Sequence, residues 1–145
     1  MQEFPHHYLV SASAEAEGTV ALKSEGMPQI VSAPPAEFGG PGDQWSPEHL
    51  LAASVADCFI LTFRAIAKAS KLEWVALEAK AEGVLDRVER VTQFTEFTVR
   101  ATLTVPAGTD EAKAQRLLTK AEGACLVTAS LKAPCHLEAD IIFAS

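Results

Sequence analysis

The sequence has little that would suit a membrane or a nucleic acid. Its 145 residues contain no uninterrupted apolar run of about 18 residues, the length that indicates a membrane-spanning helix. Basic side chains are scarce, with 12 against 19 acidic ones, and the net charge is −7. A negative protein is repelled by phosphate backbones. We therefore expect no nucleic-acid partner and no membrane partner.

Cysteine is also sparse. Three cysteines cannot all pair with one another, and no Cys-x-x-Cys is present. The first seven residues show no basic segment followed by an apolar stretch, so we expect no secretory signal and a cytoplasmic protein. The four histidines have no metal-ligand spacing, and we expect neither a metal nor another cofactor.

The composition, 48% hydrophobic and 21% charged, is typical of a folded domain. The length matches one domain, so we expect residues 1–145 to form a single α+β domain. Short alternating segments at 8–14, 18–23 and 29–32 predict a small meander. A loop rich in glycine and proline, residues 33–45, follows and predicts no regular structure.

A long helix is predicted to follow this loop. Ser46 is a plausible N-cap, Pro47 fits the first helical position, and Glu48 suits the first turn. Residues 50–66 are apolar on nearly every side. Such a helix is buried all round, in a core or against a partner subunit.

The second half of the chain alternates strands and helices. Residues 72–86 and 93–105 predict two long antiparallel strands, and the second places Phe97, Val99, Ala101, Leu103 and Val105 on one face. A helix over 110–121 is expected, capped by Thr109 and ended by Gly123. A shorter helix over 125–131 and a final strand over 136–143 complete the pattern.

Three features, taken together, point to a known family. The first is Phe38-Gly39-Gly40-Pro41-Gly42, followed by Ser46-Pro47-Glu48-His49-Leu50-Leu51-Ala52-Ala53 and by Cys58-Phe59. The second is Cys125 near the start of a late helix, and the third is the order of elements. In these features the chain resembles, over nearly its whole length, the family of the osmotically inducible protein OsmC and the organic hydroperoxide resistance proteins.

The resemblance implies an intertwined homodimer of α+β subunits, with antiparallel sheets around a long central helix that carries the first cysteine. It implies a thiol-dependent peroxidase of the oxidative stress response. Cys58 would attack an apolar organic hydroperoxide, Cys125 would resolve the product to a disulfide, and an external dithiol would restore both thiols. Glu48 would hold an arginine that contacts the reactive thiol.

The sequence departs from the family at that arginine. Its first arginine is Arg64, whereas residues 15–18 and 35–38, where the family carries one, contain no cation. Because Cys58 lies in mid-helix and burial raises a thiol pKa, we expect its thiol to stay protonated and any activity to be weak. Lys23 or Lys132 is a candidate replacement.

Two alternatives stay open at this point. Without the arginine, the protein could be a non-catalytic member of the fold that binds an apolar small molecule or acts as a slow redox sensor, with Cys58 and Cys125 as packing residues. Cys135 stands outside the family pattern and reads as an incidental cysteine at a strand edge, with an alternative resolving role.

Overall fold

The computed structural model describes residues 2–145. The chain divides into two compact units, one up to Leu50 and the other from Leu51 to Ser145. Each unit is described by itself below. The long helix α1 (Pro47–Ala69) begins in the first unit and continues into the second.

The first unit contains an antiparallel three-stranded sheet in the order β1-β2-β3. Its strands are β1 (Ser11–Ser13), β2 (Val20–Lys23) and β3 (Ile30–Ser32), so the predicted meander is confirmed. The following loop was predicted to lack regular structure, and this was wrong in one place. It contains a turn of 3-10 helix, η1 (Ala36–Phe38), which ends at Gly39 with a φ of 84° that favours glycine.

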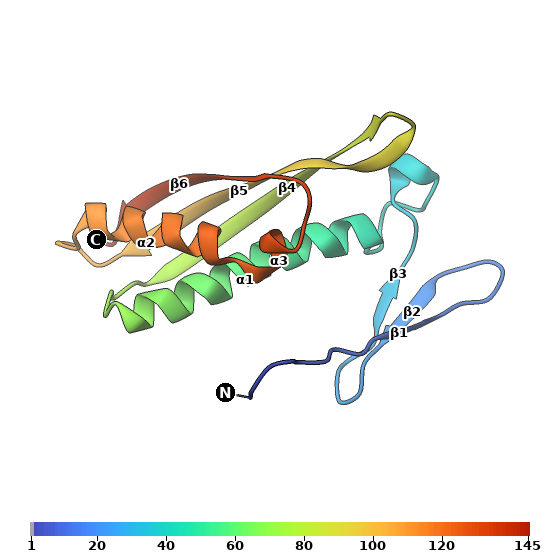
Figure 1. Cartoon of the computed structure of the whole chain (residues 1–145), viewed down its shortest axis with the longest axis horizontal. Helices are drawn as coiled ribbons and strands as arrows, with labels where there is room; N and C mark the ends of the chain where they lie inside the picture. The colour runs from blue at the N-terminus through green and yellow to red at the C-terminus, as the bar shows by residue number, and fades with distance from the viewer. Residues whose placement is uncertain (1) are drawn as a thin grey trace. The chain divides into compact units, whose positions relative to one another are not determined.

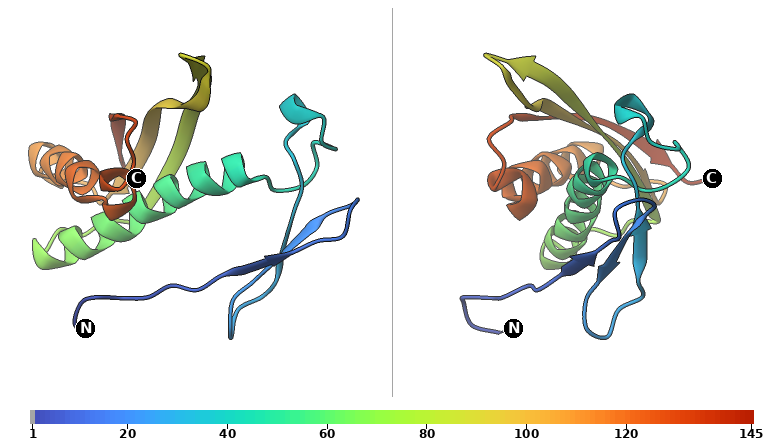
Figure 2. Two further views of the ribbon diagram at one scale, coloured as in Figure 1. Left: turned by 45° about the vertical axis from the view of Figure 1, so that its right-hand side comes forward. Right: turned by 90° about the vertical axis from the view of Figure 1, so that its right-hand side faces the viewer.

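The second unit packs helices against a mixed sheet. Its strands, β4 (Ala76–Val88), β5 (Val91–Val105) and β6 (Cys135–Phe143), lie in the order β4-β5-β6. β4 and β5 are antiparallel, whereas β6 runs parallel to β5 because α2 (Glu111–Ala124) provides the crossover between them. Figures 1 and 2 show α1 and α2 on one face of this sheet. The α+β class is confirmed, although an all-antiparallel sheet was not found.

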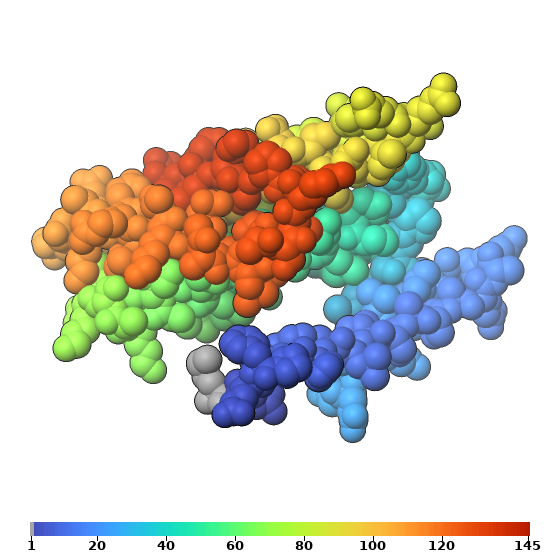
Figure 3. Space-filling model, in the orientation of Figure 1, coloured from blue at the N-terminus to red at the C-terminus, as the bar shows by residue number. Residues whose placement is uncertain are grey.

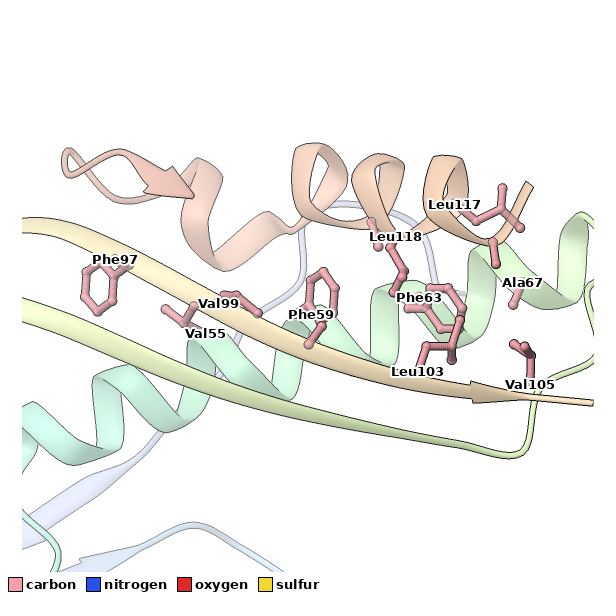
Figure 4. Packing of buried hydrophobic residues seen from close by; sticks show 13 residues of the cluster. Val55, Phe59, Phe63, Ala67, Phe97, Val99, Leu103, Val105, Leu117 and Leu118 are labelled. Atoms are coloured by element: carbon pink, nitrogen blue, oxygen red, sulfur yellow. The ribbon is translucent and has the colours of Figure 1, made fainter. Parts of the chain in front are cut away.

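The core of the second unit forms where β5 faces the two helices (Figure 4). The apolar face predicted for β5 is confirmed, since all five residues of that face are buried. From α1, Phe59 and Phe63 pack into the same cluster, and α2 contributes Leu118. Each large apolar side chain buried in this way stabilises the fold by about 1.5–3 kcal/mol.

Only one face of α1 is buried in this chain, which differs from the expectation of a helix buried all round. The buried residues recur at every fourth position, as Val55, Phe59, Phe63 and Ala67. Leu61, by contrast, is 51% exposed. By length and composition alone α1 could cross a membrane. Its buried row is nevertheless built into the core cluster, so α1 is the core helix of this unit.

The region between β5 and β6 differs from the prediction in three respects. Asp110, not Thr109, caps α2, and its carboxylate accepts a hydrogen bond from the Lys113 amide at 3.2 Å. Gly123 does not end the helix but lies inside it. The break comes at Cys125, whose extended backbone (φ −65°, ψ 115°) separates α2 from the short α3 (Leu126–Ala129).

Two glycines of this unit should respond oppositely to alanine substitution. A Cβ at Gly83, in β4, would lie 2.6 Å from the ring of Phe97 and 2.9 Å from that of Phe94, whereas nothing lies within 4 Å of one at Gly123. We expect Gly83→Ala to lower the free energy of unfolding by about 1–3 kcal/mol. Gly123→Ala should raise it by about 0.5–1 kcal/mol, because alanine favours a helix. Urea denaturation measures both, and an unchanged Gly83→Ala protein would contradict the packing described.

Candidate functional site

Cys58 lies on α1, one residue before the buried Phe59 and at the border of the core face. Its side chain is partly buried. The Sγ atom lies 3.8 Å from the hydroxyl of Thr62, one turn further along the helix. The backbone amides of Val127 and Leu126 and the side chain of Cys125 also act on this thiol, and each lowers its pKa by hydrogen bonding. Cys58 therefore faces the beginning of another helix.

These amides are free to bind sulfur because of where they stand in the chain. The first N–H groups of a helix have no carbonyl partner within that helix. Cys125 breaks the chain out of α2, so Leu126 and Val127 form the first turn of α3. The turn is closed by a 3.0 Å hydrogen bond from the Ala129 amide to the Cys125 carbonyl. The break at Cys125 thus leaves the amides of Leu126 and Val127 available as hydrogen-bond donors to Cys58.

The donors change the ionisation of Cys58. Burial, the largest single influence, raises the pKa of its thiol. The hydrogen bonds from Val127, Cys125, Thr62 and Leu126 together outweigh burial and hold the pKa below its ordinary value. The expected direction of the shift, a pKa raised by burial, is therefore wrong. The expectation considered burial and the position of Cys58 within its own helix, and it missed the amides of a second helix.

Cys125, which neighbours Cys58, also lies beside Cys135. Cys125 is buried, at 2% exposure, and Cys135 is the first residue of β6, paired with Phe97 of β5. Both thiols line a cavity that has no room for a water molecule; its walls are Val55, Phe59, Val99, Glu122, Cys125, Thr128 and Cys135. All three cysteines are free. Among residues 2–145, no three histidine, cysteine or acidic side chains converge to hold a metal ion.

Cys135 has the opposite electrostatic setting to Cys58. Burial, the negative charge of Glu122 and the neighbouring Cys125 raise the pKa of Cys135 to about 11. A hydrogen bond with the Glu122 carboxylate adds to this effect, because it favours the protonated thiol. The site therefore combines one thiol whose pKa is lowered with another whose pKa is raised.

An apolar cleft of about 230 Å³ lies further toward the beginning of α1. It is lined by Leu51, Val91, Gln93, Phe94, Phe97, Leu131, Lys132 and Ala133. Leu51 precedes Cys58 by seven residues, which places both on the same side of the helix, about 10 Å apart along its axis. Lys132, one of the two lysines considered from the sequence, contributes a cation to the cleft.

Glu48, the third predicted site residue, lies in the first unit and is not among the groups that hydrogen-bond to Cys58. Its Oε1 atom is buried and has no hydrogen-bond partner within residues 2–145. The helix start itself is as predicted, since the hydroxyl of Ser46 accepts a hydrogen bond from the His49 amide at 3.1 Å. The structure therefore brings Cys58 and Cys125 together and leaves the predicted role of Glu48 untested.

Comparison with known proteins identifies related sequences and structures. The OsmC-like protein family model matches residues 40–140. The uncharacterized protein YmaD of Bacillus subtilis is 25% identical over 138 residues, which cover 92% of this chain and 91% of that protein.

Two solved structures show the same fold. An OsmC-like protein of unknown function from Vibrio cholerae is 15% identical with a TM-score of 0.84, over 94% of this chain and all of that one. An organic hydroperoxide resistance protein, OsmC, from Legionella pneumophila is 22% identical with a TM-score of 0.73, over 97% and 99% of the two chains.

Cys58 should alkylate before Cys135 as pH rises. Because its pKa is lowered, Cys58 should react with iodoacetamide below the pH at which an ordinary cysteine ionises, whereas Cys135 should react only as pH approaches about 11. Thr62→Val removes one donor and should raise the pKa of Cys58. Thr128→Val, whose hydroxyl bonds to the Cys125 carbonyl, is the control. Mass spectrometry of alkylated peptides across pH gives each titration, and a Cys58 that titrates above an ordinary cysteine would contradict this account.

Proposed function

The chain belongs to the OsmC-like protein family, and from this premise we propose that it is a thiol-dependent peroxidase that reduces organic hydroperoxides. Family membership supports a stress-related, peroxiredoxin-like role. The observation that carries the finer proposal is the contact between Cys58, whose pKa is lowered, and Cys125. The thiolate is the nucleophile in such chemistry. A second thiol within hydrogen-bonding reach is placed to resolve the oxidised product.

The proposed cycle has three steps. Cys58 thiolate attacks the terminal oxygen of the hydroperoxide, the O–O bond breaks, and the alkoxide takes a proton and leaves as the alcohol. Cys58 is now a sulfenic acid. The Cys125 sulfur displaces its hydroxyl as water and forms the Cys58–Cys125 disulfide. An external dithiol then reduces this bond by two thiol–disulfide exchanges and is itself oxidised to a disulfide.

The cleft along α1 supports an apolar substrate. Leu51, Phe94, Phe97 and Leu131 give it an apolar lining, which favours an alkyl or aryl tail over hydrogen peroxide. Lys132 supplies a point charge for the polar end of the substrate. The cleft and Cys58 share one side of α1, so a bound hydroperoxide could extend from the cleft toward the thiol.

A homodimer in the cytoplasm fits the remaining observations. The exposed side of α1, including Leu61, offers apolar surface that a second copy could cover. Three free thiols suit a reducing compartment. We treat residues 1–145 as one functional domain, with no cofactor required by the proposed chemistry.

A second candidate function is binding without catalysis. The buried, unpartnered Oε1 atom of Glu48 favours it, because the arginine expected to engage this carboxylate has no equivalent in residues 15–18 or 35–38. In that case the apolar cleft would hold a small molecule and the thiols would oxidise only slowly. The two functions differ in the rate at which Cys58 reacts with a hydroperoxide.

Peroxidase activity is tested by the second-order rate of thiol oxidation with cumene hydroperoxide, followed by stopped flow. We expect the wild-type protein to be oxidised faster by cumene hydroperoxide than by hydrogen peroxide. Cys58→Ser should lower the rate with cumene hydroperoxide by at least about 10³-fold. Cys125→Ser should keep the first step but stop at the sulfenic acid, which dimedone traps. A wild-type rate no greater than that of free cysteine would favour the binding protein.

The dimer is tested by sedimentation at low micromolar concentration, where we expect one species of twice the 15.5 kDa chain mass. Leu61→Glu places a charge on the exposed apolar side of α1 and should shift the protein toward monomer. Thr119→Glu adds the same charge at an exposed position of α2 and should not. A folded wild-type monomer would contradict the proposed assembly.

A further inference from the structure

The three cysteines form a row in which Cys125 lies between the other two. On one side its side chain makes a hydrogen bond with Cys58. On the other it lines the same closed cavity as Cys135 and acts electrostatically on that thiol. Cys125 comes from the junction of α2 and α3, Cys58 from α1 and Cys135 from β6. Cys125 can therefore form a disulfide with either Cys58 or Cys135.

We propose that Cys135 is a second resolving thiol, which attacks Cys125 in the Cys58–Cys125 disulfide and takes over the bond as Cys125–Cys135. This inference rests on the proposed function for the origin of the first disulfide. It gives Cys135 a role in the cycle between peroxide reduction and the external dithiol. It also returns Cys58 to its reduced form before that reductant arrives.

The step is a thiol–disulfide exchange that needs no further oxidant or reductant. Cys135 loses its thiol proton to bulk water, and the thiolate attacks Cys125 Sγ in line with the Cys58–Cys125 bond. The new S–S bond forms between Cys125 and Cys135 while the old one breaks. Cys58 leaves with the electron pair as a thiolate. One disulfide and one thiolate are present before and after, so charge and electrons balance.

The two outer thiols differ in a way that drives the exchange in this direction. A thiol of low pKa is the better leaving group, and Cys58 is the thiol whose pKa is lowered. The more basic thiol, Cys135, gains more by entering a disulfide, because its thiolate is costly to form and is the stronger nucleophile. We expect Cys125–Cys135 to be the more populated disulfide at equilibrium.

The second disulfide, like the first, joins the buried Cys125 to a partly exposed thiol. Cys125 is 2% exposed, whereas Cys135 is partly exposed at the first position of β6, an edge strand of the sheet. In Figure 3 the segment between α2 and β6 lies at the visible surface of this unit. Attack of an external dithiol at Cys135 Sγ avoids the buried sulfur of Cys125.

Glu122 influences the rate of the exchange, because burial and then the charge of Glu122 hold Cys135 as the thiol. Besides burial, the groups that raise the pKa of Cys135 are Glu122 from α2 and Cys125. The other walls, from α1, β5 and α3, are Val55, Phe59, Val99 and Thr128, which carry no charge. His136 is exposed, and its Nε2 atom lies 3.7 Å from a carboxylate oxygen of Glu96. The exchange should therefore speed up roughly tenfold per pH unit below about 11, as the Cys135 thiolate fraction grows.

Tryptic mapping distinguishes the two disulfides directly. Cleavage after Lys23, Arg64, Lys120 and Lys132 places Cys58 on peptide 24–64, Cys125 on 121–132 and Cys135 on 133–145. The full chain is oxidised with one equivalent of cumene hydroperoxide, quenched with acid at successive times, alkylated and digested without reduction. A parallel sample is equilibrated with oxidised and reduced glutathione, which forms disulfides without peroxide.

We expect the 24–64/121–132 link to appear first and the 121–132/133–145 link to replace it. In Cys135→Ser the first link should persist. The glutathione sample tests the exchange on its own, and it should hold mainly the Cys125–Cys135 link. If that sample holds only Cys58–Cys125, or no Cys125 link, the inference is overturned. If it holds Cys125–Cys135 while peroxide forms no link, the inference stands and the proposed peroxidase function fails.

A variant pair tests the control by Glu122. Glu122→Gln removes the charge beside Cys135 and should accelerate the conversion of the first link to the second by roughly three- to tenfold near pH 7. Glu111→Gln removes the same charge from the first turn of α2, at an exposed position, and should leave the conversion unchanged. Equal conversion rates in the two variants would overturn the assigned role of Glu122.

Discussion

The site depends on the contact between the Cys58 thiol and the first amides of α3. Burial alone would raise the pKa of this thiol, and the amides of Leu126 and Val127, with Thr62 and Cys125, lower it. The donors are backbone groups, so their position is set by the path of the chain rather than by a mobile cationic side chain. The pKa of Cys58 is therefore lowered without an arginine, provided that α3 begins where it does.

The core of the second unit fixes that starting point. The buried row of α1 and the apolar face of β5 hold the helix against the sheet, and Cys58 lies beside Phe59 at the border of this row. On the other side, α2 packs through Leu118 and ends at Cys125. The same break in the chain thus positions the amide donors, the Cys125 thiol and the cavity that contains Cys135.

Much of this framework could be predicted from the sequence, because its signals are local. The alternation of β5, the meander and the Ser46 cap each depend on residues close together in the chain. The activation of Cys58 could not be predicted in this way, because it depends on amides 68 and 69 residues further along the chain. Gly123 was a misleading signal, since it is accommodated inside α2 and the break falls two residues later. The neighbours of Cys135 likewise could not be predicted, because they come together only when β6 pairs with β5.

The central claim is that backbone amides lower the pKa of Cys58, and one pair of variants tests it directly. Leu126→Pro removes an amide at the first position of α3, where proline is tolerated, and the extended Cys125 before it suits a following proline. Leu126→Ala keeps the amide and loses the same side chain, which is 70% exposed. The measurement is the Cys58 thiol pKa, from the pH dependence of its alkylation. The account predicts a higher pKa in the proline variant than in the alanine variant, and the same pKa in both folded proteins would contradict it.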